Sequence, residues 1–119
     1  MPSIETSLRY AVALALAAAA LASAEDARIE AGRALAHDFS KGNCLACHLA
    51  PADAKAVTKA NIAPPLSMIR ERFPNREALR AQIWDPTQRN PDTVMPPFGK
   101  HRILTDQEIE LVIDYLYTL

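Results

Sequence analysis

Two cysteines and a histidine stand close together in the run Cys44-Leu45-Ala46-Cys47-His48. Two thiols at this C-x-x-C spacing, with an imidazole directly after them, are typical of covalent c-type haem attachment. One short turn of chain can then present both sulfurs to the vinyl groups at one porphyrin edge and the ring nitrogen to the iron. The sequence contains no other cysteine. We therefore expect one haem c, bound covalently through Cys44 and Cys47, with His48 as an axial ligand of the iron.

A zinc site and a redox-active disulfide are the alternatives for this motif. A structural zinc site takes four Cys or His ligands, usually with a second pair at similar spacing. The two other histidines, His37 and His101, are not paired in this way. A thioredoxin-type motif lies in a βαβ context, which this sequence lacks. The sequence favours haem over both alternatives.

The second axial ligand of the iron has four candidates. Met95 is followed by two prolines, which stiffen its loop and can hold a thioether sulfur in place. Met68 follows the haem motif too closely to reach the opposite face easily, and we interpret it as a core gap-filler. His37 is expected on the polar side of a helix, at the surface. We predict Met95 as the ligand, with His101 as its alternative.

The segment Asn61–Leu66 contains two adjacent prolines, Pro64 and Pro65. A ligating histidine usually donates its other ring N–H to a fixed acceptor. A backbone carbonyl of this proline segment, that of Pro64, would serve, and Leu66 would cover the haem. An ordinary proline loop is the alternative interpretation.

The first 24 residues have the anatomy of a secretory signal peptide. An apolar stretch, Ala11–Leu21, precedes the small-x-small pattern Ala22-Ser23-Ala24. That stretch is shorter than the roughly 20 residues that a membrane anchor needs. We predict cleavage after Ala24, a cytochrome domain over residues 25–119, and a periplasmic location with no membrane anchor.

The predicted mature chain is nearly neutral. Without Arg9 and Glu5, the totals of 13 basic and 14 acidic residues become 12 and 13. A nucleic-acid-binding protein would show a basic excess. A chain this short buries limited apolar surface by itself, so we expect the haem to complete the core and the haem-free chain to be poorly folded.

Residues 27–40 predict the first helix of the mature chain, with an apolar face that continues to Phe39. Gly32 lies inside this helix, where glycine costs about 1 kcal/mol relative to alanine. Close approach of a second helix would explain it. We expect the C-terminal helix to pack there, with Tyr115 and Leu116 against Gly32.

Two further helices have clear N-terminal signals. Asn75 is expected to cap a helix over residues 76–84. Thr105 and Glu108 have the spacing of a capping box. Eight of the nine prolines follow residue 50, and no period-2 apolar alternation is present, so the mature protein is predicted to be all-α. The C-terminal helix carries an apolar stripe at i, i+3, i+4 and i+7: Ile109, Val112, Ile113, Leu116 and Leu119.

A locally basic stretch follows the proline segment. It is expected to be a solvated face, or else to pair with a haem propionate or an acidic partner. Trp84 is expected either to donate its indole N–H to a propionate or to be a core aromatic. The basic residues of the stretch are Arg70, Arg72, Arg76 and Arg80.

Gly42–His48 resembles the haem site of class I cytochromes c, and Ala63–Leu66 resembles their proline segment. Arg89–Gly99 is similar to the methionine loop of the SoxX family, the small cytochromes of the sulfur-oxidation (Sox) system. The segments Ile103–Thr105 and Glu108–Leu116 are similar to that family too. The likeness extends from about residue 32 to the C-terminus. The resemblance implies the class I cytochrome c fold, in which N- and C-terminal helices pack around a covalently bound haem.

The same resemblance implies an electron-transfer role. Members of the SoxX family pair with a SoxA-type cytochrome subunit in the periplasm. The SoxAX heterodimer is an L-cysteine S-thiosulfotransferase that oxidatively joins thiosulfate to a cysteine of the carrier SoxYZ. This chain would accept the electrons on a His48/Met95 haem and pass them to a soluble cytochrome c. Since haem uses both Cys44 and Cys47, the catalytic cysteine is expected on the partner.

Two other functions are weighed against this one. A free class I cytochrome c that carries electrons to a terminal oxidase would show a one-signed ring of charge at its haem edge. The near-neutral balance does not favour it. A haem sensor needs an open distal site, which a Met-Pro-Pro loop opposes.

Overall fold

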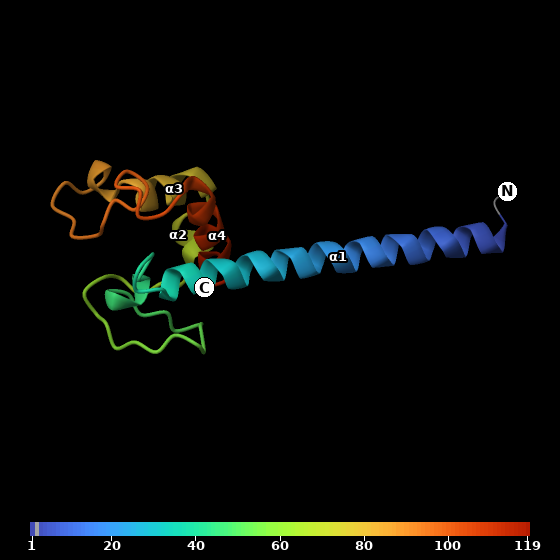
Figure 1. Ribbon diagram of the computed structural model, residues 1–119, viewed down its shortest axis with the longest axis horizontal. Coiled ribbons are helices and arrows are strands. Elements are labelled where there is room, and N and C mark those ends of the chain that lie inside the picture. The colour runs from blue at the N-terminus through green and yellow to red at the C-terminus, as the bar shows by residue number, and fades with distance from the viewer. Residues whose placement is uncertain (2) are drawn as a thin grey trace.

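A computed structural model describes Met1 and residues 3–119. Within this described part the regular structure is helical and contains no β-strand, which confirms the all-α prediction. Figure 1 shows one long helix with a small domain at its C-terminal end. The elements are α1 (Ile4–His37), η1 (Cys44–Ala46), α2 (Ile69–Arg72), α3 (Arg76–Trp84), η2 (Pro86–Gln88) and α4 (Asp106–Leu116).

Helix α1 is longer than the helix predicted over residues 27–40. It begins at Ile4 and includes the segment predicted to be a signal peptide, which extends away from the domain (Figure 1). By length and composition α1 could cross a membrane, and none of its most apolar window is buried. The boundary after Ala24 stays a prediction.

The end of α1 also differs from the prediction. The helix ends at His37, because the Asp38 carboxylate accepts hydrogen bonds from the backbone N–H and the hydroxyl of Ser40 and turns the chain away. Phe39 therefore lies outside the helix and is 90% exposed. Its predicted place on the apolar face of the helix is wrong.

The C-terminal part of α1 packs on α4 at Gly32. A Cβ atom at Gly32 would lie 1.9 Å from the Leu111 carbonyl oxygen and 3.0 Å from the Tyr115 Cβ. The prediction that α4 approaches Gly32 closely is confirmed, and so is the role of Tyr115. Leu116 lines a separate cleft instead, and the atoms nearest to that position besides Tyr115 belong to the Leu111 backbone.

Helices α3 and α4 begin where their caps were predicted. The Asn75 side chain accepts the Glu77 N–H, and Thr105 and Glu108 form both hydrogen bonds of a capping box. The two helices are joined by ion pairs, from Arg76 to Glu110 and Asp114 and from Arg80 to Asp106 and Glu110. Two arginines of the basic stretch are thus paired within the fold.

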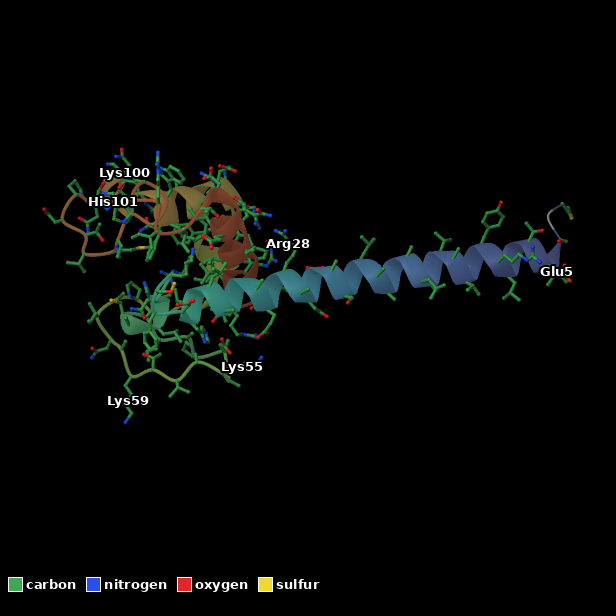
Figure 2. All side chains as sticks on the ribbon, viewed as in Figure 1. Glu5, Arg28, Lys55, Lys59, Lys100 and His101 are labelled. Atoms are coloured by element: carbon green, nitrogen blue, oxygen red, sulfur yellow. The ribbon has the colours of Figure 1, made fainter. Side chains whose placement is uncertain are left out.

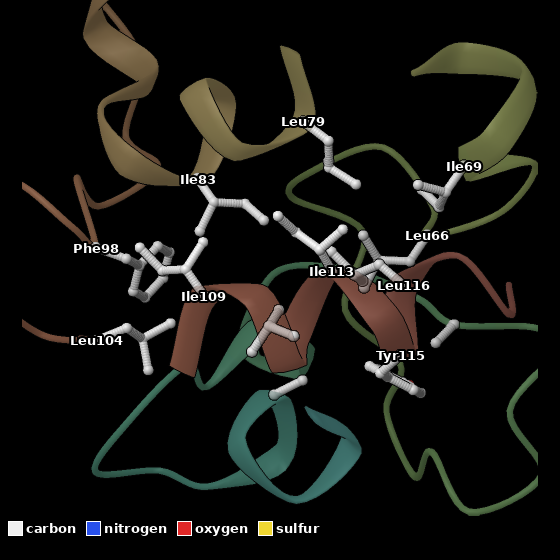
Figure 3. Packing of buried hydrophobic residues seen from close by; sticks show 13 residues of the cluster. Leu66, Ile69, Leu79, Ile83, Phe98, Leu104, Ile109, Ile113, Tyr115 and Leu116 are labelled. Carbon is white, nitrogen blue, oxygen red and sulfur yellow. The ribbon is translucent and has the colours of Figure 1, made fainter. Parts of the chain in front are cut away.

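The core lies between α4, α3 and the chain that joins them, as Figure 3 shows. Ile109, Val112, Ile113 and Leu116 of the predicted stripe are buried, and Leu119 is half-buried. Across from them lie Ile83 of α3 and Phe98 and Leu104 of the connecting loop. This core forms the floor of the cleft described next.

Candidate haem site

One cleft brings together residues that are far apart in the sequence. It contains Cys44 and His48 of the C-x-x-C-H motif together with Leu66 and Met95. Except for His48, every residue around it is apolar or carries sulfur, so the cleft favours a large apolar group with a site for metal ligation. The residues that line it are Cys44, His48, Leu66, Ile83, Met95, Phe98, Leu104, Val112 and Leu116.

The C-x-x-C-H motif folds into a single turn. The His48 and Cys47 amides both donate to the Cys44 carbonyl, at 3.0 and 3.2 Å. Cys44 lines the cleft, and burial raises the pKa of its thiol to about 11, so the sulfur is uncharged at neutral pH. Cys47 is a half-buried free thiol on the same turn. Gly42 brings the motif close to α1, where its N–H donates to the Leu35 carbonyl at 3.0 Å.

The His48 ring is oriented by the proline segment. Its Nδ1 lies 2.5 Å from the Pro64 carbonyl oxygen, so the ring N–H donates there and Nε2 is left for a metal. The Ala63 amide donates to the Cys47 carbonyl at 3.0 Å, and the Leu66 amide donates to the Leu49 carbonyl at 2.7 Å. The segment is thereby fastened along the motif. The Pro64 ring is exposed, whereas Leu66 lines the cleft.

Met95 reaches the cleft from the loop between α3 and α4. Its amide donates to the Thr93 hydroxyl at 3.1 Å, and its Sδ accepts a weak hydrogen bond from Gln82 Nε2 at 3.6 Å. Further along, the Gly99 backbone lies on the Trp84 ring, where a Cβ would come within 1.9 Å of Cε3. Trp84 also lies under the Arg80 guanidinium, which favours its predicted packing role.

The other candidate ligands do not line the cleft. His101 is an exposed residue of the connecting loop, where Figure 2 labels it. Met68 is 63% exposed, and its backbone is left-handed (φ 51°) where α2 begins. The prediction of a core gap-filler there is wrong, because this conformation turns the side chain to solvent.

His37, predicted at the surface, is half-buried, with 24% of its side chain exposed. Its Nε2 lies 3.2 Å from the buried Asp53 carboxylate and 3.4 Å from the Tyr115 hydroxyl. The Asp53 carboxylate accepts hydrogen bonds from the Tyr115 hydroxyl at 2.7 Å and from Arg33 Nε at 3.2 Å. Asp53 thus ties the loop after the haem motif to α1 and α4. A single aspartate in a polar loop gave no signal of this role.

The Asp53 carboxyl remains ionised to an unusually low pH. Burial alone would raise its pKa, but hydrogen bonds from Tyr115 and the Lys55 amide, with the charge of Arg33, outweigh burial and hold the pKa below its ordinary value. The buried carboxylate is therefore charged and fully partnered at neutral pH.

A second buried carboxylate, Asp85, organises the loop that carries Met95. It accepts hydrogen bonds from the Thr87 hydroxyl, from Gln88 and from the Lys100 ammonium at 2.9 Å. The Thr87 and Lys100 bonds hold the pKa of this carboxyl far below its usual range. The sequence contains no local signal for the pairing of Asp85 with Lys100.

The residues of the cleft fit a haem c. Two thiols on one turn can form thioethers, the His48 ring has one nitrogen engaged and one free, and a thioether sulfur is present in the same apolar cleft. A zinc site would need several closely grouped His, Cys, Asp or Glu side chains, and no group of three or more is found among the described residues.

Comparison with known proteins agrees with this geometry. A curated relative from Aquifex aeolicus (strain VF5), named "Uncharacterized lipoprotein", is 32% identical over 77 residues. The match covers 65% of this chain and 36% of the relative. A family model described as cytochrome c matches residues 29–119, which include every residue that lines the cleft. The chain belongs to the cytochrome c family of electron-transfer proteins, which bind haem c covalently.

Proposed function

We propose that the chain binds one haem c through thioethers at Cys44 and Cys47, with His48 and Met95 as the axial ligands. The observation that carries this proposal is the single apolar cleft lined by Cys44, His48 and Met95. The haem supplies one-electron chemistry at its iron. His101 and Met68, which compete with Met95, are exposed outside the cleft.

The chain's own residues set the conditions for electron transfer. The hydrogen bond from His48 to the Pro64 carbonyl makes the imidazole a better donor and fixes its plane. A thioether at Met95 raises the reduction potential relative to a second histidine. The apolar side chains of Leu66, Ile83 and Phe98 exclude water from the cleft. These features suit an electron acceptor that keeps both axial ligands in either oxidation state.

We further propose that this electron carrier is the cytochrome subunit of a SoxAX-type thiosulfate-oxidising enzyme. The support is the similarity of Arg89–Gly99 and the C-terminal helix to the SoxX family. Haem uses both cysteines, so the thiol chemistry belongs to a SoxA-type partner. Oxidative coupling of thiosulfate to a SoxYZ cysteine releases two electrons. This chain accepts them one at a time and passes each to a soluble cytochrome c.

We place the mature protein in the periplasm, with cleavage after Ala24. The exposed apolar part of α1 supports export, and the relative named as a lipoprotein agrees with it. Intact mass of the purified protein tests this step. A chain that begins at Glu25 and carries one haem is expected, and retention of residues 1–24 would contradict it.

Affinity capture from thiosulfate-grown cells tests the enzyme assignment. A C-terminally tagged chain is expected to recover a second haem-c polypeptide in equal amount from the periplasm. Deletion of the gene should stop thiosulfate oxidation, and the wild-type chain should restore it. A protein that is only monomeric, and whose deletion leaves thiosulfate oxidation intact, is a free electron shuttle instead.

A further inference from the structure

The short helix α2 is a fixed platform beside the haem cleft. Ile69 is 3% exposed within the core, and its amide donates to the Leu119 carbonyl at 3.4 Å. Arg70 Nε donates to the Tyr117 carbonyl at 3.1 Å, with its guanidinium 4.6 Å from the centre of the Tyr117 ring. Core packing and the C-terminal residues therefore hold α2 in place.

Arg72 extends from this platform to the proline segment. Its Nη1 donates to the Pro65 carbonyl at 2.9 Å and to the Ser67 carbonyl at 3.3 Å. Arg72 forms no ion pair in the structure as far as the described residues show. Both of its side-chain hydrogen bonds therefore go to the segment that orients His48.

The proline segment needs this support, because Pro64 and Pro65 have no N–H to donate. The backbone holds the segment to the haem motif only through the Ala63 and Leu66 amides on either side of the prolines. The Pro64 carbonyl lies between these two points and accepts from His48 Nδ1 at 2.5 Å. Arg72 binds the carbonyl of Pro65, the residue that directly follows Pro64.

We propose that Arg72 is a positioning residue for the axial histidine. Its guanidinium fixes the carbonyls of Pro65 and Ser67, and through them it holds the Pro64 carbonyl in line with His48 Nδ1. The proposal rests on the axial role proposed for His48. Arg72 itself touches neither His48 nor the cleft.

The two effects of losing Arg72 have opposite signs. A freed Pro64 carbonyl weakens the hydrogen bond from His48, so the imidazole donates less to the oxidised iron and the reduction potential rises. Loss of a positive charge near the iron instead stabilises the oxidised form and lowers the potential. Arg72→Lys separates them, because lysine keeps the charge but its ammonium lies one bond closer to the backbone than Nη1, the atom that donates to both carbonyls.

The test compares the haem-loaded Arg72→Lys and Arg72→Gln variants with wild type. The first readout is solvent exchange of the His48 Nδ1 proton, followed by NMR in the reduced, diamagnetic protein. The second readout is the reduction potential. We expect about tenfold faster exchange or more in both variants, which corresponds to a loss of about 1.4 kcal/mol, the scale of one hydrogen bond, from the closed arrangement that protects the proton. We also expect an upward shift of the potential in Arg72→Lys.

Arg70→Gln is the matched control. It removes a guanidinium from the same helix, together with one hydrogen bond to a backbone carbonyl, and leaves the proline segment untouched. Its exchange rate should equal that of wild type. Less than tenfold acceleration in the Arg72 variants, or equal acceleration in Arg70→Gln, overturns the proposal. The visible spectrum of the wild-type protein reports the axial ligands of the iron independently. Failure of the proposed haem ligation can therefore be distinguished from failure of the proposal for Arg72.

Discussion

Two segments carry the proposed ligands of the cleft, residues 44–66 (the histidine wall) and residues 85–104 (the methionine wall). Each contains one buried carboxylate that does not line the cleft, and the partners of the two carboxylates come from different parts of the chain. Asp53, on the histidine wall, binds Arg33 and His37 of α1 and Tyr115 of α4. Asp85, on the methionine wall, binds groups no more than 15 positions away, and Lys100 is the most distant of them. The histidine wall is therefore part of the global fold, whereas the methionine wall is a locally closed loop.

This difference has a functional meaning for an electron carrier. The histidine side is joined to α1 and α4, so it cannot move without loosening the packing of the domain. The methionine loop can loosen while the helices stay in place, because its bonds are local. Disturbing the histidine wall should lower stability, and disturbing the methionine loop should change the ligand and the potential. Five predictions test this contrast.

The largest effect should follow removal of haem attachment, which affects both walls. The Cys44→Ser, Cys47→Ser double variant is expected to lack covalent haem and to lose a cooperative thermal transition, because the cleft walls then lose their common core. Circular dichroism during heating measures this, with the haem-loaded wild type as control. A cooperative transition in the double variant would show that the domain folds without covalently bound haem.

Asp53→Ala should cost the domain about 2–3 kcal/mol, since it removes the hydrogen bonds from Arg33 and Tyr115 and the contact with the His37 ring. Denaturant unfolding of the haem-loaded protein measures the loss. The sulfur-to-iron charge-transfer band should persist under native conditions. A variant as stable as wild type would show that the contacts of Asp53 with α1 and α4 do not stabilise the domain.

Met95→Ala should leave the helices folded and abolish the charge-transfer band of the oxidised protein. The reduction potential should fall, because a thioether favours the reduced iron. Visible spectroscopy and potentiometry measure both changes. Met68→Ala is the matched control and should retain the band, since Met68 is 63% exposed. A band that survives Met95→Ala but not Met68→Ala would reverse the assignment.

Acid should weaken the histidine wall as Asp53 becomes protonated. The pKa of Asp53 is lowered in the folded protein, so the stability it contributes is full above the unfolded value, near 4, and is lost as pH falls through the folded value. Unfolding free energies measured between pH 6 and pH 3 should fall for wild type. Asp53→Asn should show a shallower fall, and equal slopes would exclude Asp53 as the cause.

Asp85→Asn should release the methionine loop. We expect faster replacement of Met95 by added imidazole, because Thr87 and Lys100 lose their charged acceptor. The thermal midpoint should fall as well, since a carboxyl whose pKa is held far below its usual range stabilises the folded state at neutral pH. Stopped-flow spectroscopy measures the replacement. A large drop in the midpoint, with unchanged ligand replacement, would mean that the methionine loop is not a local unit.

The sequence was most informative where the structure depends on local signals. The caps at Asn75 and Thr105 act within one turn, and both were predicted correctly. The motif at Cys44–His48 and the stiff loop at Met95 likewise indicated residues that line one cleft. The close approach at Gly32 was predictable because glycine inside a helix requires a reason.

What the sequence did not reveal depends on distant contacts. Asp53 accepts a hydrogen bond from the Tyr115 hydroxyl, 62 positions away, and no sequence periodicity predicts such a pair. The contact of the half-buried His37 ring with Asp53 was not predicted for the same reason. Met68 was placed in the core because its type favours burial, and the left-handed backbone that exposes it has no signal in a methionine.

Helix α1 runs without a break across the proposed processing point. Cleavage after Ala24 would leave a helix whose first turn contains Glu25 and Asp26. Amide groups at a helix N-terminus carry a partial positive charge, which nearby carboxylates stabilise. The same two carboxylates offset the α-amino group that cleavage creates. Maturation would thus remove the projecting part of the helix and leave, packed on α4, a shorter helix whose new end is already electrostatically compensated.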